Sequence, residues 1–173
     1  MKFEEVIGID VSKFTLDACI HSLQILIQVP NTKRGYRKLL SQTTKSIGCP
    51  MEQVLFCFEH TGMYSYVLAS FLSEKQISYV IVPGLEIKRS LGIQRGKSDQ
   101  IDAKKIAQYA YRRRDEVKLY HIPEKSINQI RQLLSLRERL VKQRAGFEAT
   151  LKDQGDFLDR SENKLLFSIP EKL

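Results

Sequence analysis

Three short apolar segments at the start of the chain limit its fold more than any other feature. They cover residues 6–11, 14–20 and 23–29, and only Ser12-Lys13 and His21-Ser22 separate them. Connections this short join neighbouring antiparallel strands. The first 30 residues therefore predict a three-stranded antiparallel meander.

After residue 30 the sequence alternates between helical and strand patterns. Apolar residues recur at helical spacing in residues 33–45 and 64–72, whereas 54–58 and 77–82 are apolar runs typical of strands buried on both faces. Strand-helix-strand connections make the joined strands parallel. We therefore predict an α/β fold with a mixed five-stranded sheet flanked by helices, in which the first strand lies beside the fourth.

Four carboxylates occur where acids need an explanation. Asp10 interrupts the first strand, Glu59 ends the fourth, and Asp99 and Asp102 open a helix predicted for residues 99–114. The carboxyl ends of parallel strands face one crevice, so we expect these acids to converge. Carboxylates at close quarters need cations, and Mg2+ or Mn2+ accept oxygen ligands beside phosphate. Two such ions can promote phosphodiester cleavage or strand transfer.

The pair on the helix also has a simpler interpretation. Ser98 and Asp99 are residue types that cap helices, and acids suit the positive end of the helix dipole. However, Asp99 and Asp102 share a helix face with Ala103 and Ile106 rather than with the lysines. An ionised carboxylate on a packing face is costly unless it is paired or binds a cation, which favours the metal interpretation.

Positive charge concentrates around the same helix. The net charge of the chain is +8, and residues 88–114 contain nine Lys or Arg residues against two acids. A basic segment around an acidic pair suits a polyanionic substrate such as DNA, although a merely soluble basic helix is the alternative. The candidate nucleic-acid contacts are Lys13, Lys97, Lys104, Lys105, Arg112, Arg113 and Arg114.

A long amphipathic helix is predicted from residue 124 to about 159. This stretch contains no proline, and Pro123 marks the boundary between a domain of residues 1–123 and a helical segment of residues 124–173. A helix of about 30 residues is about 45 Å long, so part of it should project and pair with a second copy; folding back on the sheet is the alternative. The expected contacts of this homo-oligomer are Leu133, Leu136, Leu140 and Phe147.

Composition excludes two other classes. No segment is long and apolar enough to span a membrane, and acids interrupt the N-terminus where a signal peptide needs an apolar run, so we expect a cytoplasmic protein without a membrane partner. Cys19, Cys49 and Cys57 lack C-x-x-C spacing and are predicted to be reduced thiols.

Three motifs resemble those of the insertion-sequence-110 transposases. They are Gly8-Ile9-Asp10-Val11-Ser12-Lys13, Glu59-His60-Thr61-Gly62-Met63-Tyr64 and Lys97-Ser98-Asp99-Gln100-Ile101-Asp102-Ala103, the last followed by Ile106-Ala107. The resemblance implies a RuvC-like DEDD domain of ribonuclease-H-like fold, with Asp10, Glu59, Asp99 and Asp102 as the catalytic acids that bind metal. It also implies a coiled coil from about residue 124, a structured guide RNA that bridges donor and target DNA, and a nucleoid-associated protein of a bacterial or archaeal cell.

The resemblance ends before the family's second domain. Family members continue into a domain that supplies a catalytic serine, and no residue here matches that serine, so we expect only the N-terminal half of a DNA transposase. A non-catalytic module for nucleic-acid binding and oligomerisation is the alternative. An ATP-binding domain of the actin type fits less well, because 173 residues offer neither a second comparable domain nor a Gly-rich adenosine loop.

Overall fold

The computed structural model describes residues 3–91, 99–123 and 125–154. The chain divides into two compact units, residues 1–122 and residues 123–173, which we describe separately. The first unit contains a sheet with helices on both faces. The described part of the second unit is dominated by one helix, α5 (Lys125–Gln154).

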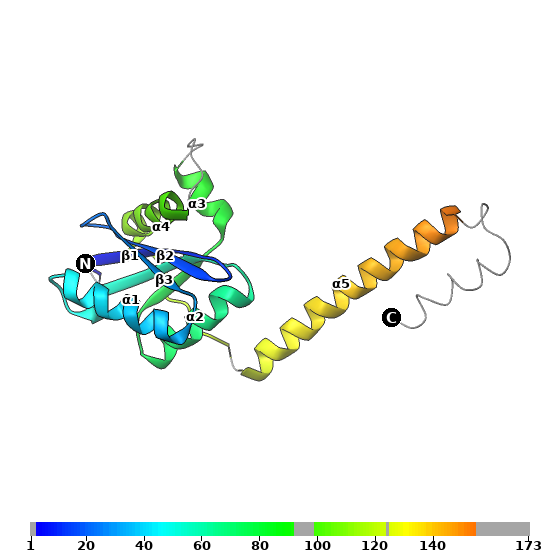
Figure 1. Cartoon of the computed structure of the whole chain (residues 1–173), viewed down its shortest axis with the longest axis horizontal. Helices are drawn as coiled ribbons and strands as arrows, with labels where there is room; N and C mark the ends of the chain where they lie inside the picture. The colour runs from blue at the N-terminus through cyan, green and yellow to red at the C-terminus, as the bar shows by residue number, and fades with distance from the viewer. Residues whose placement is uncertain (1–2, 92–98, 124, 155–173) are drawn as a thin grey trace. The chain divides into compact units, whose positions relative to one another are not determined.

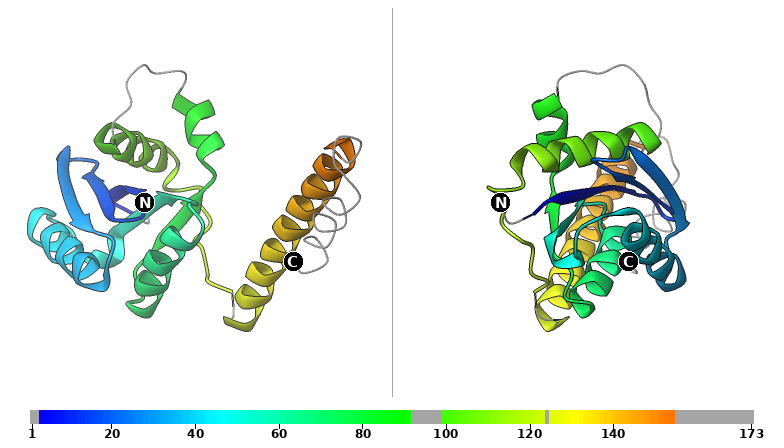
Figure 2. Two further views of the ribbon diagram at one scale, coloured as in Figure 1. Left: turned by 45° about the vertical axis from the view of Figure 1, so that its right-hand side comes forward. Right: turned by 90° about the vertical axis from the view of Figure 1, so that its left-hand side faces the viewer.

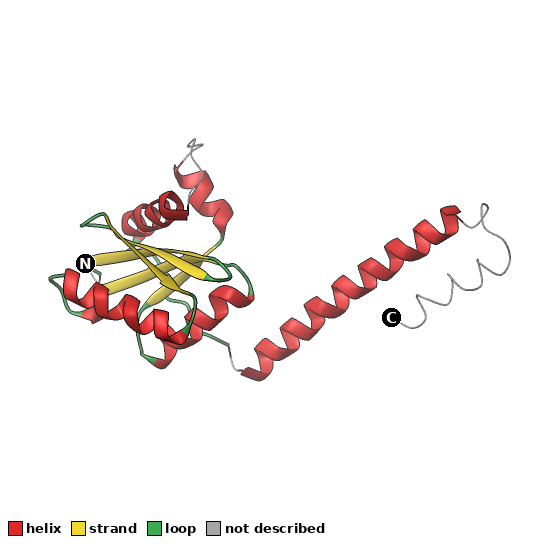
Figure 3. Ribbon diagram, in the orientation of Figure 1, coloured by secondary structure: helices red, strands yellow, loops and turns green. Residues whose placement is uncertain are grey.

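The sheet of the first unit is mixed, as the sequence predicts. Its strands are β1 (Glu5–Val11), β2 (Thr15–Ile20), β3 (Ile25–Pro30), β4 (Val54–Glu59) and β5 (Tyr79–Val82). Their spatial order is β3-β2-β1-β4-β5. Figure 3 shows the strands of this sheet in yellow. Strands β1, β2 and β3 are antiparallel neighbours, whereas β4 is parallel to β1 and to β5. The meander and the parallel half are therefore both confirmed, with β1 beside β4 in a ribonuclease-H-like arrangement.

Helices cover both faces of this sheet. Helices α1 (Lys33–Ser46) and α2 (Met63–Glu74) lie on one face, and α3 (Gly84–Leu91) and α4 (Asp99–Arg113) lie on the other (Figures 1 and 2). A short 3-10 helix, η1 (Met51–Gln53), precedes β4. Because successive strand residues point to opposite faces, Ile7 and Ile9 pack in the core beside α1 and α2, whereas Val6 packs in the core beside α3 and α4.

Two turns of the meander differ from the prediction. The connection between β2 and β3 covers residues 21–24 rather than His21-Ser22 alone, and Gln24 closes it with a positive φ of 54°. Phe14, which the apolar pattern assigns to the second strand, lies in the turn before β2 and is 73% exposed. The pattern misplaced Phe14 because apolar character alone does not distinguish a buried strand residue from an exposed turn residue.

Helix α4 approaches β1 closely at Gly8. A Cβ atom added there would lie 2.5 Å from the carbonyl oxygen of Ala103 and 2.6 Å from Cα of Ala107, so no other residue type fits without moving the helix. The three small residues therefore allow backbone to pack against backbone. The helix predicted for residues 99–114 is observed as α4, which ends one residue earlier, at Arg113. The loop expected at residues 92–96 and the cap expected at Ser98 lie outside the described residues.

The direction of α4 follows from its other end. Tyr111, in its last turn, stacks on the His21 ring with 3.9 Å between ring centroids, and the His21 amide donates to the carbonyl of Val6. Residue 111 therefore lies toward the start of β1, while residues 103 and 107 lie over Gly8. Helix α4 thus runs opposite to β1, and its first turn is directed toward the end of that strand.

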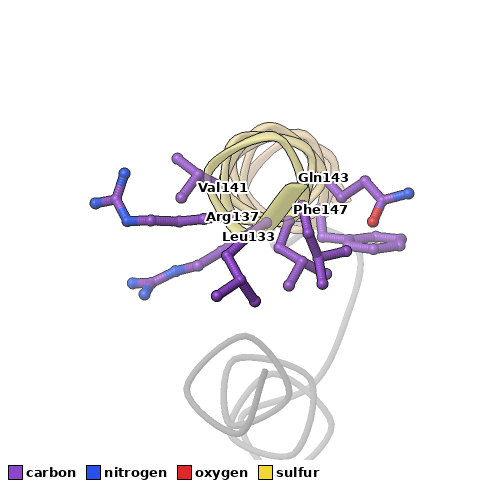
Figure 4. Close-up of a pocket in the computed structure, with 8 residues that line it drawn as sticks. Leu133, Arg137, Val141, Gln143 and Phe147 are labelled. Carbon is purple, nitrogen blue, oxygen red and sulfur yellow. The ribbon is translucent and has the colours of Figure 1, made fainter. Parts of the chain in front are cut away.

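Helix α5 carries exposed apolar side chains along its length. Leu133 is 65% exposed and Phe147 is 55% exposed, and both line a hollow whose described lining residues all belong to α5. Figure 4 looks along this helix: the side chains spread over a wide arc from Arg137 and Val141 to Gln143 and Phe147. In the described part of the chain, no helix has the length and apolar character needed to cross a membrane.

Candidate active site

Asp10 and Glu59 lie on neighbouring strands at the same edge of the sheet. Parallel pairing aligns Ile9 of β1 with Phe58 of β4, so each acid is the next residue on its own strand. Glu59 in turn pairs with Val82 of β5. Both acidic residues are half-buried. The carboxyl ends of the parallel strands thus carry two acids side by side, as the sequence predicts.

Asp10 faces α4. It lies two residues after Gly8, so its side chain is on the sheet face against which Ala103 and Ala107 pack. Because α4 runs opposite to β1, the residues that precede Ala103 lie toward Asp10. Asp102 is one of them, and Asp99 is the first residue of the helix, although its side chain is outside the described part of the structure.

Glu59 is held against the start of α3. A Cβ atom added at Gly84 would lie within 2.8 Å of both carboxylate oxygens of Glu59, so the absence of a side chain at residue 84 creates the space that this carboxylate occupies. Gly84 itself has no positive φ. Its role here is to leave space for Glu59 rather than to allow an unusual backbone conformation.

The turn after Glu59 is fixed by hydrogen bonds. The buried Ser65 hydroxyl accepts from the Thr61 amide at 3.0 Å and donates to the Gly62 carbonyl at 3.1 Å. Gly62 has a φ of 64°, a conformation that glycine adopts at little cost. His60 uses Nδ1 to accept from the Gly62 amide at 3.5 Å, which gives this ring a local structural role.

Asp102 has a basic partner, so the prediction that it lies on the packing face away from the lysines is wrong for Lys105. Its Oδ1 lies 3.1 Å from Nζ of Lys105, one helical turn later, and its side chain is 42% exposed. Among the described side chains, no three His, Cys, Asp or Glu residues are grouped closely enough to hold one metal ion. That set includes Asp10, Glu59 and Asp102, but it does not include Asp99. Carboxylate oxygens are nevertheless the ligand type that hard divalent cations require.

The structure adds a fifth acid, Asp17, that the sequence reasoning missed. Asp17 on β2 is the direct antiparallel partner of Asp10, so both side chains are on the face toward α4. It is only 3% exposed, and its Oδ1 accepts from Nε2 of Gln28 at 2.9 Å. The signal was available, because Asp17 interrupts an apolar strand as Asp10 does.

Two cysteines on the same sheet face are inert thiols. Cys57 precedes Glu59 by two residues on β4, and Cys19 packs with Ala103 and Ala107. Burial raises the pKa of both thiols, which keeps them protonated and poorly nucleophilic. All three cysteines are free, as the sequence predicts.

The predicted nucleic-acid contacts have different environments. Lys104 and Arg112 are exposed, and Lys13 is an exposed residue of the turn after β1. Arg113 and Arg114 instead lie over the rings of Tyr109 and Tyr111, with 5.1 and 3.9 Å from guanidinium carbon to ring centroid. Arg114 also donates to the carbonyl of Tyr111. Lys97 lies outside the described residues.

The sheet order and its flanking helices define the class of this protein, a ribonuclease-H-like α/β domain with acids at the carboxyl ends of its parallel strands. A family profile then gives the narrower assignment: the profile of the insertion-sequence-110 DEDD family, described as "Transposase", matches residues 7–155. The chain therefore belongs to this transposase family and carries its DEDD catalytic domain.

Solved structures similar to this chain include two of RuvC. RuvC of T. thermophilus in complex with Holliday junction substrate has a TM-score of 0.48 and 13% identity, covering 67% of this chain and 99% of that chain. A second Thermus thermophilus RuvC structure has a TM-score of 0.41 and 12% identity, covering 68% of this chain and 100% of that one. A comparison with curated proteins finds no match.

Proposed function

We propose that this chain is the metal-dependent DNA-cleaving domain of a transposase, with Asp10, Glu59, Asp99 and Asp102 as its catalytic acids. The observation that carries the proposal is the close packing of α4 on Gly8, which directs the first turn of α4 toward the strand edge that holds Asp10 and Glu59. Membership of the transposase family supplies the reaction class, phosphodiester cleavage or strand transfer during transposition of an insertion sequence.

The four acids would hold two Mg2+ or Mn2+ ions. When bound, such ions activate a water or hydroxyl for attack on phosphorus and stabilise the leaving oxygen. Asp10 and Glu59 come from adjacent strands of a rigid sheet, so they would supply the fixed side of the site. Asp102 would exchange its ion pair with Lys105 for the cation, which would release the Lys105 ammonium toward a phosphate.

The remaining groups would position the substrate and the acids. The Ser65 hydrogen bonds hold the turn after Glu59, and the space at Gly84 fixes where its carboxylate can lie. Asp17 would add negative charge beside Asp10 and favour cation binding over a vacant site. Exposed Lys104 and Arg112 would contact the DNA backbone.

Cation binding by the full chain tests this proposal. Mn2+ should raise the melting temperature, because a ligand that binds only the folded state stabilises it. Asp10→Asn and Glu59→Gln should each abolish most of this rise and also the cleavage of a DNA substrate. Asp115→Asn, which changes an exposed acid beyond α4, is the matched control and should behave as the wild type. An equal Mn2+ effect in all four proteins would refute the site.

Family membership also supports two finer proposals, one about an RNA partner and one about where the protein acts. We propose that the DNA is chosen by a structured guide RNA, as the family resemblance implies, and that the protein acts at the nucleoid in the cytoplasm. The positive charge of the chain suits both nucleic acids. Addition of a candidate structured RNA should change which DNA sequence is retained in a pull-down with the purified chain. Retention independent of that RNA would contradict the guide.

We further propose that α5 pairs with a second copy of the chain. Its stripe of exposed apolar residues is the supporting observation, since burying these side chains is favourable. The residues proposed for the contact are Leu133, Leu136, Leu140 and Phe147. Light scattering should report a dimer or higher oligomer for the wild type and a monomer for a variant with Leu133→Gln and Leu140→Gln. A monomeric wild type would contradict the pairing.

The ion pair of Asp102 with Lys105 supports a second candidate, a module that binds nucleic acid and oligomerises without catalysis. In such a module this pair would be permanent and the acids would serve the fold. The Mn2+ experiment separates the two candidates, because the module would bind DNA without any cation-dependent rise in melting temperature. Loss of that rise in Asp10→Asn would exclude the module.

A further inference from the structure

The turn between β1 and β2 presents two unusual residues at its tip. Phe14 is 73% exposed, the largest exposed fraction among the large apolar side chains of the described chain. The ammonium nitrogen of its neighbour Lys13 lies 5.0 Å from the centre of the Phe14 ring. A cation next to an exposed ring is a combination that suits a nucleotide, since it offers one contact for a phosphate and one for a base.

The turn itself is held by its own hydrogen bonds. The amide of Ser12 donates to the carbonyl of Thr15 at 3.0 Å, and the Ser12 hydroxyl accepts from the Thr15 amide at 3.0 Å. The same hydroxyl donates to the Thr15 carbonyl at 2.9 Å. These bonds connect the two residues that flank Lys13 and Phe14, so they hold the backbone of the tip.

Asn31 connects the turn to the rest of the fold. Its amide donates to the carbonyl of Phe14 at 2.8 Å, and its Nδ2 donates to the carbonyl of Ser12 at 2.7 Å. The hydroxyl of Tyr36, which is buried on α1, donates to Oδ1 of Asn31. The tip is therefore joined through Asn31 to the hydrophobic core. Because the backbone of the turn is already held, ordering it costs little conformational freedom when it binds a partner.

The position of the turn relates it to the acids. It begins directly after β1, so it lies at the edge of the sheet where β1 and β4 end and where Asp10 and Glu59 are found. Ligands of sheets with parallel strands bind outside these carboxyl ends. A DNA strand whose phosphate reaches the acids would therefore pass close to this turn.

We propose that Phe14 stacks on an unpaired base of the DNA substrate while Lys13 contacts the adjoining phosphate. This inference rests on the proposed function, since it names how the same site holds its DNA. The base must be unpaired, because bases inside a duplex already stack on their neighbours. The basic neighbour and the transposase family favour DNA over an apolar protein pocket as the occupant of this tip.

Binding of the full chain to DNA that contains 2-aminopurine tests the proposal. On single-stranded DNA, the wild type should quench the fluorescence of this base, and Phe14→Ala should remove the quenching and weaken binding about 5- to 150-fold. Phe14→Trp should retain both properties, because another aromatic ring can stack. Lys13→Ala should weaken binding to single strands and duplexes alike and reduce the salt slope by about 1.

Leu23→Ala is the matched control, because Leu23 is an exposed apolar residue of the other meander turn, and it should bind as the wild type does. Wild-type affinity and quenching in Phe14→Ala would overturn the stacking. If Phe14→Ala changes the oligomeric state but not DNA binding, the stacking would also be overturned. The Phe14 ring would then contact another protein chain instead of a base. Failure of the wild type itself to bind DNA would instead refute the proposed function.

Discussion

Replacing Gly8 with alanine should push α4 away from the sheet. The added methyl group would lie 2.5 Å from the Ala103 carbonyl oxygen and 2.6 Å from Cα of Ala107, whereas ordinary contact begins at 3.4 Å. Both neighbours are backbone atoms of a helix, so neither can rotate away. The helix must therefore move by about 1 Å, a forced rearrangement of a packed core.

The expected cost has two parts. Overpacking of this kind destabilises by about 1–3 kcal/mol, and we expect the upper end because backbone must move. For a chain of this size, about 3 kcal/mol lowers the melting temperature by roughly 6–12 °C. The same shift displaces Asp102 relative to Asp10, and a misplacement of about 1 Å lowers a catalytic rate on the order of 100-fold.

Circular dichroism melting curves and a DNA cleavage assay below the melting temperature measure the two parts separately. Gly48→Ala and Gly146→Ala are suitable controls, because a Cβ added at either position meets nothing within 4 Å. Neither control should melt below the wild type, and Gly146→Ala should stabilise α5 by up to about 1 kcal/mol. A Gly8→Ala protein that melts within about 2 °C of the wild type would refute the close packing of α4 on β1.

Four further substitutions test the site and its surroundings. In Gly84→Ala the added methyl group takes the place of the Glu59 carboxylate, which can rotate away. The melting temperature without Mn2+ should stay within about 3 °C of the wild type, while most of the Mn2+-induced rise should disappear. A full Mn2+-induced rise would show that Glu59 does not bind the cations. Asp17→Asn should weaken Mn2+ binding, measured by calorimetry, about 10- to 100-fold. An unchanged affinity would show that this buried acid serves only the fold. Burial lowers the pKa of His21 below its ordinary 6.5, so the unfolded chain takes up this proton first as the pH falls. Stability is then lost as the pH drops from above 6.5 through the lowered pKa, and His21→Phe should lose less stability than the wild type in urea titrations over that range; equal losses would contradict this. Arg112→Ala should reduce the slope of log affinity for DNA against log salt by about 1, and an unchanged slope would show that it contacts no phosphate.

The elements of this fold could be predicted because each has a local signal. The apolar runs of β1, β4 and β5 and the helical spacing in α1 and α2 are properties of neighbouring residues, and short connections left few ways to arrange them. The same local view selected Asp10 as a candidate, because an acid inside an apolar strand conflicts with its surroundings. It failed at Phe14, whose apolar character suits a strand while its backbone is in a turn.

The contacts between distant segments were decided only by the tertiary structure. Nothing in the sequence around Glu59 indicates that its carboxylate lies against Gly84, and nothing around Asp10 indicates that Asp17 is its partner across the sheet. Both relations depend on strand register and on how closely a helix approaches the sheet. The sequence by itself therefore determined which segments form strands and helices and where acidic residues stand in them. Packing decided which of these residues contact one another, because strand register and the approach of a helix to the sheet depend on all the contacting segments together.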